Sequence, residues 1–288
     1  MSSIIALLTD FGLQDIYVGV MKGVMLDIHP EARLVDISHA IEPQHVRQGA
    51  IALRDACTFF PAGTVFLVVI DPGVGSTRRP VAVQARGYTF VGPDNGVLTY
   101  ALEKLDAEVQ IVELVNPEYR LPQVSTTFHG RDIFAPAAAH LAAGVPLAHL
   151  GPSLERLVQL PRPELNIAGA SVTGEVTQID RFGNITTSIG RLRWVQEDRL
   201  LLEPVFEPQG GPLMVSAPEA TVTLNGQTIH EIRVSYSEAL RGDLLALVGS
   251  TGYLEVAVNQ GDAARRLEVS VGDRVELVVG DFDAAVRN

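Results

Sequence analysis

Residues 65–75 read VFLVVIDPGVG, an unbroken apolar run that ends in an aspartate and a turn with two glycines. Such runs are typical of strands in an α/β sheet, and here they alternate with longer helix-like stretches through the first half of the chain. We therefore expect an α/β domain with a mostly parallel sheet. The expected strands are Ile4–Leu8, Arg33–Ile37, Thr64–Ile70, Val81–Arg86 and Gln110–Val115, and the expected helices are Asp15–Ile28, Gln44–Phe59, Gly96–Leu105 and Arg131–Ala143.

The second half of the chain has a different composition and a different hydrophobic pattern. Prolines interrupt Val145–Ala168, and beyond them short alternating segments are separated by Gly and Asp. This pattern predicts a smaller antiparallel β domain that is barrel-like. We place the boundary so that residues 1–162 form the first domain and residues 163–288 the second. The expected strands of the second domain are Ser171–Ile179, Ala220–Leu224, Leu244–Val248, Leu254–Val258 and Arg274–Val279.

Composition narrows the classes of partner. The 288 residues are 47% hydrophobic and 19% charged, which is enough apolar material to close the cores of about two domains. The formal net charge of -12 argues against nucleic acid or an anionic membrane as the main partner, so a small molecule is the expected ligand. The first apolar run is too short for a signal peptide, and no other run approaches the roughly 18 residues of a membrane span, so we expect a cytoplasmic protein.

Cysteine and histidine usage bears on metals and cofactors. Cys57 is the only cysteine, so neither an internal disulfide nor a thiolate metal cluster can form, and its apolar neighbours predict a packed thiol. The seven histidines show no clear ligand spacing. We expect no metal and no cofactor, although the aspartates that follow the strands leave a metal-dependent phosphoesterase as an alternative.

Acidic residues follow three of the apolar strands. In an open parallel sheet, ligands bind beyond the carboxyl ends of the strands, so Asp10, Asp71 and the pair Asp94–Asn95 are candidates for a binding edge. Asp10 could accept hydrogen bonds from the two hydroxyls of a ribose, with Gly12 leaving room for close approach. Alternatively, Asp10 is the N-cap of the next helix.

A possible water-activating group stands on two further loops. The glycines after Asp71 let the loop fold back so that Arg78 can meet the carboxylate, where a guanidinium can hold a hydroxide-like nucleophile. A purely structural ion pair has the same pattern. His129 lies just before an expected helix, whose positive end favours a neutral imidazole that can accept a proton, although a single histidine is more often structural.

The second half contains two candidate binding turns. One is Asp180-Arg181-Phe182-Gly183-Asn184, where Asn184 could read a base edge, Phe182 could stack on it and Asp180 could meet an ammonium group. The other is Gly249-Ser250-Thr251-Gly252-Tyr253, whose amides and hydroxyls could hold a carboxylate. Ordinary β-turns would show the same residue types.

Six motifs in this order resemble the S-adenosylmethionine hydroxide adenosyltransferase family over nearly the whole chain. They are Leu8-Thr9-Asp10-Phe11-Gly12, Asp71-Pro72-Gly73-Val74-Gly75 with Arg78, Gly92-Pro93-Asp94-Asn95-Gly96, Phe128-His129-Gly130-Arg131-Asp132, Asp180-Arg181-Phe182-Gly183-Asn184 and Gly249-Ser250-Thr251-Gly252-Tyr253-Leu254-Glu255. The resemblance implies an N-terminal α/β domain, a C-terminal β domain and a homotrimer with active sites between one subunit's first domain and a neighbour's second.

The resemblance also implies roles for single residues. An Asp, Arg and His triad that positions water in the family corresponds to Asp71, Arg78 and His129, and the acid that binds the ribose corresponds to Asp10. The contacts to adenine and to the methionine portion correspond to Asp180, Asn184, Ser250, Tyr253 and the backbone at Val258. Tyr236 corresponds to the aromatic residue that stacks on adenine.

The implied reaction is hydrolysis of S-adenosyl-L-methionine (SAM) to adenosine and L-methionine. The sulfonium makes methionine a good leaving group, so the substrate needs only an aligned water for in-line attack on ribose C5′. Either Asp71 or His129 is the proton acceptor, and Arg78 stabilises the developing hydroxide. The alternatives are a chlorinase or fluorinase on the same scaffold, whose fluorinating members carry an inserted loop not evident here, and a SAM or adenosine sensor without turnover.

Overall fold

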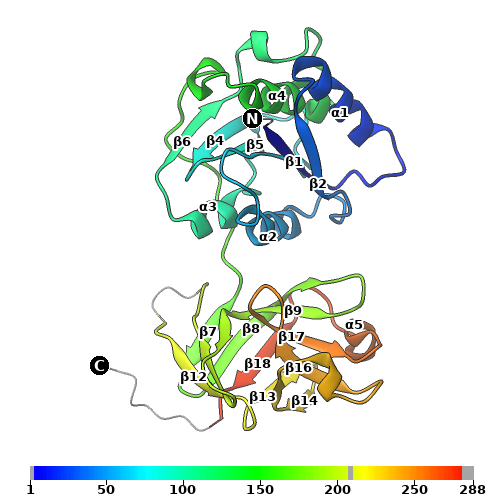
Figure 1. Cartoon of the computed structure of the whole chain (residues 1–288), viewed down its shortest axis with the longest axis vertical. Helices are drawn as coiled ribbons and strands as arrows, with labels where there is room; N and C mark the ends of the chain where they lie inside the picture. Colours follow the sequence, from blue (N-terminus) through cyan, green and yellow to red (C-terminus); the bar gives the residue numbers. More distant parts are fainter. Residues whose placement is uncertain (1–2, 207–209, 281–288) are drawn as a thin grey trace. The chain divides into compact units, whose positions relative to one another are not determined.

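The computed structural model describes residues 3–206 and 210–280 of the chain. The chain divides into two compact units after Leu160, and each unit has its own core (Figure 1). Among the described residues, no helix is both long enough and apolar enough to cross a membrane.

The first unit is built on a six-stranded sheet of order β2-β1-β3-β5-β4-β6 in the described residues. Neighbours β1–β2, β1–β3 and β3–β5 are parallel, whereas β4 is antiparallel to both β5 and β6. The strands are β1 (Ile4–Thr9), β2 (Arg33–Ser38), β3 (Val65–Val69), β4 (Pro80–Ala85), β5 (Tyr88–Pro93) and β6 (Val109–Glu113).

The sheet is therefore mixed, and the expectation of a mostly parallel sheet is not confirmed. The reason lies in Arg86 and Gly87, which both have positive φ, of 48° and 81°. Two such residues form the tight turn that joins antiparallel neighbours, so β4 and β5 make a hairpin instead of a crossover unit. The return direction of β4 also brings its first residue, Pro80, to the sheet edge where β3 ends.

Helices cover both faces of this sheet (Figure 1). Alternate residues of β1 show the two layers, because Ile5 and Leu7 pack into the core beneath one pair of helices and Ala6 and Leu8 into the core beneath the other. A single π-helical turn, Gly130–Phe134, runs directly into α4. The helices are α1 (Tyr17–Ile28) and α4 (Ala135–Ala142) on one face, α2 (Val46–Cys57) and α3 (Thr99–Leu105) on the other, and the short 3-10 turns are Pro117–Tyr119 and Leu147–His149.

The second unit is a nearly closed, barrel-like sheet of order β14-β13-β18-β8-β9-β17-β16-β15, with β7 paired to β8. Its neighbours are antiparallel except β15 and β16, and β14 also contacts β16, which nearly closes the sheet. The predicted barrel-like β architecture is thus confirmed in this coarse form. A separate antiparallel sheet has the order β10-β11-β12.

The elements of the second unit are short and separated by tight turns. The strands are β7 (Leu165–Ala168), β8 (Ser171–Ile179), β9 (Ile185–Gly190), β10 (Leu192–Trp194), β11 (Arg199–Leu202), β12 (Leu213–Ser216), β13 (Thr221–Leu224), β14 (Gln227–His230), β15 (Ile232–Arg233), β16 (Leu244–Val248), β17 (Tyr253–Val258) and β18 (Arg274–Val278), with η4 (Tyr236–Glu238) and α5 (Ala263–Leu267) between them.

Candidate active site

The carboxyl ends of β1 and β3 lie side by side at one edge of the first sheet. Thr9 and Val69 are paired residues, so Asp10 and Asp71, one and two residues further on, follow the two strands at the same edge of the sheet. The edge thus gathers the two aspartates that the sequence singles out there. Neighbouring parallel strands place such side chains around a common ligand position.

Asp71 and Arg78 form a buried, two-pronged ion pair. The Arg78 Nε donates to Asp71 Oδ1 at 2.9 Å, and Arg78 Nη2 donates to Oδ2 at 2.5 Å. Their side chains are only 5% and 9% exposed, so water screens the pair weakly. The glycine-rich loop makes this possible, because Gly75 has a φ of 77° and a Cβ there would overlap the Thr126 carbonyl oxygen.

His129 completes the group. Its Nδ1 lies 2.7 Å from the same Arg78 Nη2. A guanidinium can only donate hydrogen bonds, so Nδ1 must accept, and the neutral ring then carries its proton on Nε2. Burial lowers the pKa of His129, and the Arg78 charge lowers it further, against opposing effects of Asp71, Asp132 and the Ser125 backbone. The arrangement therefore stabilises a neutral imidazole that has an N–H to offer.

Asp132 supports the loop that carries His129. Its side chain is fully buried and accepts from the Ser125 backbone N–H at 2.8 Å, the Ser125 hydroxyl at 2.7 Å and Arg131 Nε at 2.6 Å. These bonds depress the pKa of Asp132 despite the opposing effect of burial. The sequence predicted no role for Asp132, although a charged residue in a largely apolar helical stretch was the available signal.

A second network, which runs from the buried Thr9 and His39 to the exposed Asp36, lies behind Asp10. Thr9 Oγ1 bonds to His39 Nδ1 at 2.8 Å, His39 Nε2 lies 3.0 Å from Asp36, and Asp36 pairs with Lys22. Asp10 Oδ2 accepts the backbone N–H of Gln44 at 2.7 Å. Helix α1 begins at Tyr17 with no side-chain cap, so the structure does not support the alternative that Asp10 is an N-cap. His39 was not identified as part of this edge from the sequence.

Asp94 and Asn95 have local structural partners. Asp94 pairs with Arg79 and accepts the backbone N–H of Val158 at 2.8 Å, while Asn95 Nδ2 donates to the Ile70 carbonyl. The bond from Val158 attaches the segment before the second unit to the sheet, and the Asn95 bond joins the ends of β5 and β3. The pair Asp94–Asn95, the third candidate at the strand ends, therefore has a structural role in the first unit.

In the second unit, Asp180 organises its own turn. Its Oδ1 accepts the backbone N–H groups of Phe182 and Asn184, and its Oδ2 accepts Asn184 Nδ2, all at 2.8–2.9 Å. Asn184 is thereby oriented next to the carboxylate. The Phe182 ring is 65% exposed, and the Arg181 guanidinium lies over it, 5.3 Å from the ring centre. An exposed aromatic ring beside an amide and an acid could receive a planar base.

The remaining predicted contact residues lie on or around β16 and β17. Ser250 is exposed in the loop between these strands, whereas the Tyr253 ring is buried and stacks on Phe206 with ring centres 6.1 Å apart. Val258 is a buried end residue of β17. Tyr236 is 42% exposed, and its hydroxyl donates to Glu255. Of the two tyrosines, only Tyr236 presents its ring at the surface.

Comparison with known proteins matches both halves of the chain to the same family. Sequence profiles of the SAM hydroxide adenosyltransferase N-terminal and C-terminal domains match residues 5–151 and 174–276. The chain belongs to the SAM hydroxide adenosyltransferase family. This confirms the family predicted from the six motifs.

Individual relatives of this family support the assignment. A protein of Salinispora arenicola named (R)-S-adenosyl-L-methionine hydrolase is 37% identical, with 96% of this chain and 98% of the relative covered. A protein of Nocardia brasiliensis named fluorinase is 32% identical, with 96% and 97% covered. The crystal structure of an uncharacterized conserved protein from Thermotoga maritima matches with a TM-score of 0.83 at 37% identity, covering 95% of this chain and 99% of that one.

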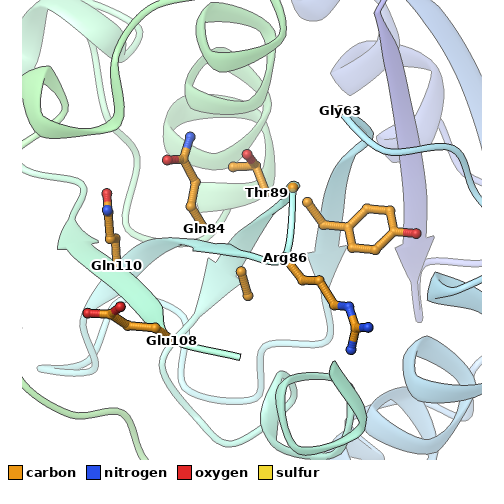
Figure 2. Close-up of a pocket in the computed structure, with 9 residues that line it drawn as sticks. Gly63, Gln84, Arg86, Thr89, Glu108 and Gln110 are labelled. Atoms are coloured by element: carbon orange, nitrogen blue, oxygen red, sulfur yellow. The ribbon is translucent and has the colours of Figure 1, made fainter. Parts of the chain in front are cut away.

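The first unit also has a hollow at the opposite edge of its sheet (Figure 2). It encloses about 410 Å³ and is lined by residues at the start of β5 and β6 and the end of β4, including Gln84, Thr89 and Gln110. Arg86 Nη1 there donates to the Leu105 carbonyl. This open hollow contains none of the residues predicted for the reaction, so the strand-end edge remains the candidate active site.

Proposed function

We propose that this chain hydrolyses S-adenosyl-L-methionine to adenosine and L-methionine. The observation that carries the proposal is the Arg78 guanidinium held between Asp71 and His129 at the sheet edge that also bears Asp10. The full-length similarity to proteins named SAM hydrolase supports the same reaction. SAM carries its own leaving group, because the sulfonium sulfur departs as a neutral thioether.

Water attacks C5′ in line with the departing sulfur. The C5′–O bond forms as the C5′–S bond breaks, the electron pair of the latter stays on methionine sulfur, and one proton of the water must be removed. Alignment of the two reacting atoms is the main contribution that a protein can make to such a step. Asp71, Arg78 and His129 supply fixed polar groups around the water.

The hydrogen-bond pattern favours Asp71 over His129 as the proton acceptor. His129 Nδ1 is occupied by Arg78, and Nε2 already carries a proton, so His129 acts as a donor that orients the water or the ribose. Asp71 is the only one of the three groups with lone pairs to accept a proton as the reaction proceeds. Arg78 keeps both neighbours in place and stabilises negative charge on the attacking oxygen.

Substrate binding is divided between the two units. Asp10 binds the ribose hydroxyls. The adenine and the ammonium group are received by Asp180, Phe182, Asn184 and Tyr236. The pocket is completed by Ser250, Tyr253 and the Val258 backbone.

We also propose that the protein is a homotrimer in which a first domain and a neighbour's second domain form each site. Exposed apolar side chains near the proposed binding residues of both domains support a subunit interface there. Leu13 and Ile16 in the first domain are each 76% exposed, and Leu240 in the second domain is 77% exposed. A cytoplasmic location and catalysis without a metal remain predictions from the sequence.

The competing function is halide transfer to C5′, because relatives named fluorinase also match along the chain. The alignment with the Nocardia fluorinase spans 308 positions although this chain has 288 residues, so part of that fluorinase has no counterpart here. This agrees with the lack of an inserted loop in the sequence. The complete Asp71, Arg78 and His129 group favours water over halide.

Chromatography of products tests the assignment. The purified protein is incubated with SAM in halide-free buffer, and then with chloride or fluoride. Adenosine without halide is the expected product. A 5′-halogenated adenosine formed only on addition of halide would assign the chain to the halogenases, whereas ligand binding without any product would identify a sensor. Loss of activity on treatment with a chelator, restored by a divalent metal, would contradict the metal-free mechanism.

A further inference from the structure

Glu255 stands in the middle of the second unit's sheet. Strand β17 pairs with β16 on one side and β9 on the other, so the backbone at Glu255 is held from both sides. The side chain lies on the same face of β17 as Ala257, because residues two apart on a strand point the same way. On that face, Ala257 packs with Ala239, Leu245 and Leu247.

The segment with Tyr236 covers this face and is anchored at both ends. Before the turn, Ile232 is buried and pairs with β16. After the turn, Ala239 is buried and its carbonyl accepts Asn259 Nδ2 at 2.8 Å. Between these anchors the chain is exposed, with Val234 at 58% and Tyr236 at 42%, so packing alone leaves the tyrosine ring weakly fixed.

The Tyr236 hydroxyl of this exposed segment donates to Glu255 Oε1 on β17. The Glu255 carboxylate also lies against Gly249, where an added Cβ would be 2.7 Å from Oε2. One carboxylate thus touches the Tyr236 ring segment and the first residue of the Gly249–Tyr253 loop. The bond to Glu255 is sufficient to account for the position of the Tyr236 hydroxyl.

We propose that Glu255 is a positioning residue that holds the Tyr236 ring as one wall of the adenine pocket, so that nucleoside affinity depends on its ionisation. This rests on the proposed function insofar as Tyr236 contacts the purine. An ionised carboxylate accepts a hydroxyl hydrogen bond about twice as strongly as a neutral acceptor does. Affinity is therefore highest when Glu255 is charged.

The charged groups around Glu255 set the direction of the pH effect. Burial raises the pKa of Glu255, the Asp180 charge raises it further, and the bond from Tyr236 opposes them. Its cross-strand partners, Thr186 on β9 and Leu247 on β16, are uncharged. Arg233, one strand further along, is bound by the Glu231 carboxylate and the Glu238 carbonyl. As the pH falls through this raised pKa, the bond weakens and affinity falls.

Equilibrium binding of adenosine across pH tests this independently of turnover. We expect Glu255→Ala and Tyr236→Phe each to weaken binding roughly tenfold at neutral pH, and the double variant to lose little more, since both remove one interaction. Glu255→Gln keeps an acceptor oxygen, so it should bind within about threefold of wild type and lose the acid-side decline.

Glu276 provides the matched control. It is also a half-buried strand glutamate in the second unit, and it accepts the Ser171 hydroxyl at 2.6 Å. Glu276→Ala should leave adenosine binding unchanged. Additive losses in the double variant, or an acid-side decline retained in Glu255→Gln, would overturn the positioning role. Normal adenosine binding with no hydrolysis of SAM would contradict the proposed function and leave the Glu255 test intact.

Discussion

The two halves of the molecule prepare their functional residues in opposite ways. In the first unit, Asp71, Arg78 and His129 are held by buried bonds to one another before any ligand arrives. In the second, Phe182 and Tyr236 lie on exposed turns, and Asp180 is occupied with the backbone of its own turn. Preorganised groups favour the transition state, whereas exposed groups contribute mainly to binding. The buried group of Asp71, Arg78 and His129 should therefore control kcat, and the exposed residues of the second unit should control KM.

Arg78→Lys should give the largest effect. Lysine cannot bond to both Asp71 oxygens and to His129 together, so we expect kcat to fall by roughly a hundredfold to a thousandfold, as for loss of a transition-state donor. Steady-state rates of adenosine formation measure it. Arg79→Lys is the control, because Arg79 makes a similar pair with Asp94 outside the group. Equal losses in both variants would show that the Arg78 effect is merely structural.

His129→Ala should lower kcat by about 10- to 100-fold, because one oriented N–H donor is lost while the Asp71–Arg78 pair remains. In the wild type, the neutral ring is the working form and its pKa lies below the ordinary value of 6.5. Activity should thus stay level as pH falls through 6.5 and decline only at lower pH. A decline in kcat centred at or above 6.5 would contradict the neutral-donor assignment.

Asp10→Asn tests a residue of the first unit assigned to binding. The substitution removes the charge but keeps one oxygen for the Gln44 amide, so the loop should persist. Loss of charge-assisted bonds to the ribose should raise KM about tenfold with little change in kcat. Steady-state kinetics separate the two constants. If kcat fell as strongly as for His129→Ala, Asp10 would have to be counted with the reacting group.

Phe182→Ala should give the smallest effect. The ring is 65% exposed and contributes mainly contact area, so we expect KM to rise about threefold to fivefold and kcat to be unchanged. Arg181→Ala, which removes the guanidinium over the ring, serves as the neighbouring control. A loss of more than a hundredfold in kcat would break the comparison between the units.

The sequence allowed much of the first unit to be predicted, because its strands are long apolar runs and its chemistry follows them directly. Asp71 and Arg78 could be paired from glycine spacing. The alternation of strands with helices predicted parallel strands throughout, so the mixed sheet could not be predicted. Arg86 and Gly87, which both have positive φ, form a tight turn that makes β4 and β5 antiparallel. Asp132 and His39 were missed because their roles come from partners distant in the chain or from burial.

The second unit was less predictable. Strands such as β10, β11 and β15 have only two to four residues, too few to show a period. The contact of Tyr236 with Glu255 joins residues 19 apart through an irregular turn, which no local pattern encodes. Nor does any local pattern encode the burial of the Tyr253 ring, which stacks on Phe206.

The direction of β4 has a consequence for the order in which the site assembles. Because β4 starts at the edge where β3 ends, the chain between them never crosses the sheet, and Asp71 meets Arg78 within a loop closed by residues only seven apart. Closing so short a loop costs little chain entropy. The acid and its guanidinium can therefore meet early during folding, and the arrival of His129, 51 residues further on, is the later step that matures the site.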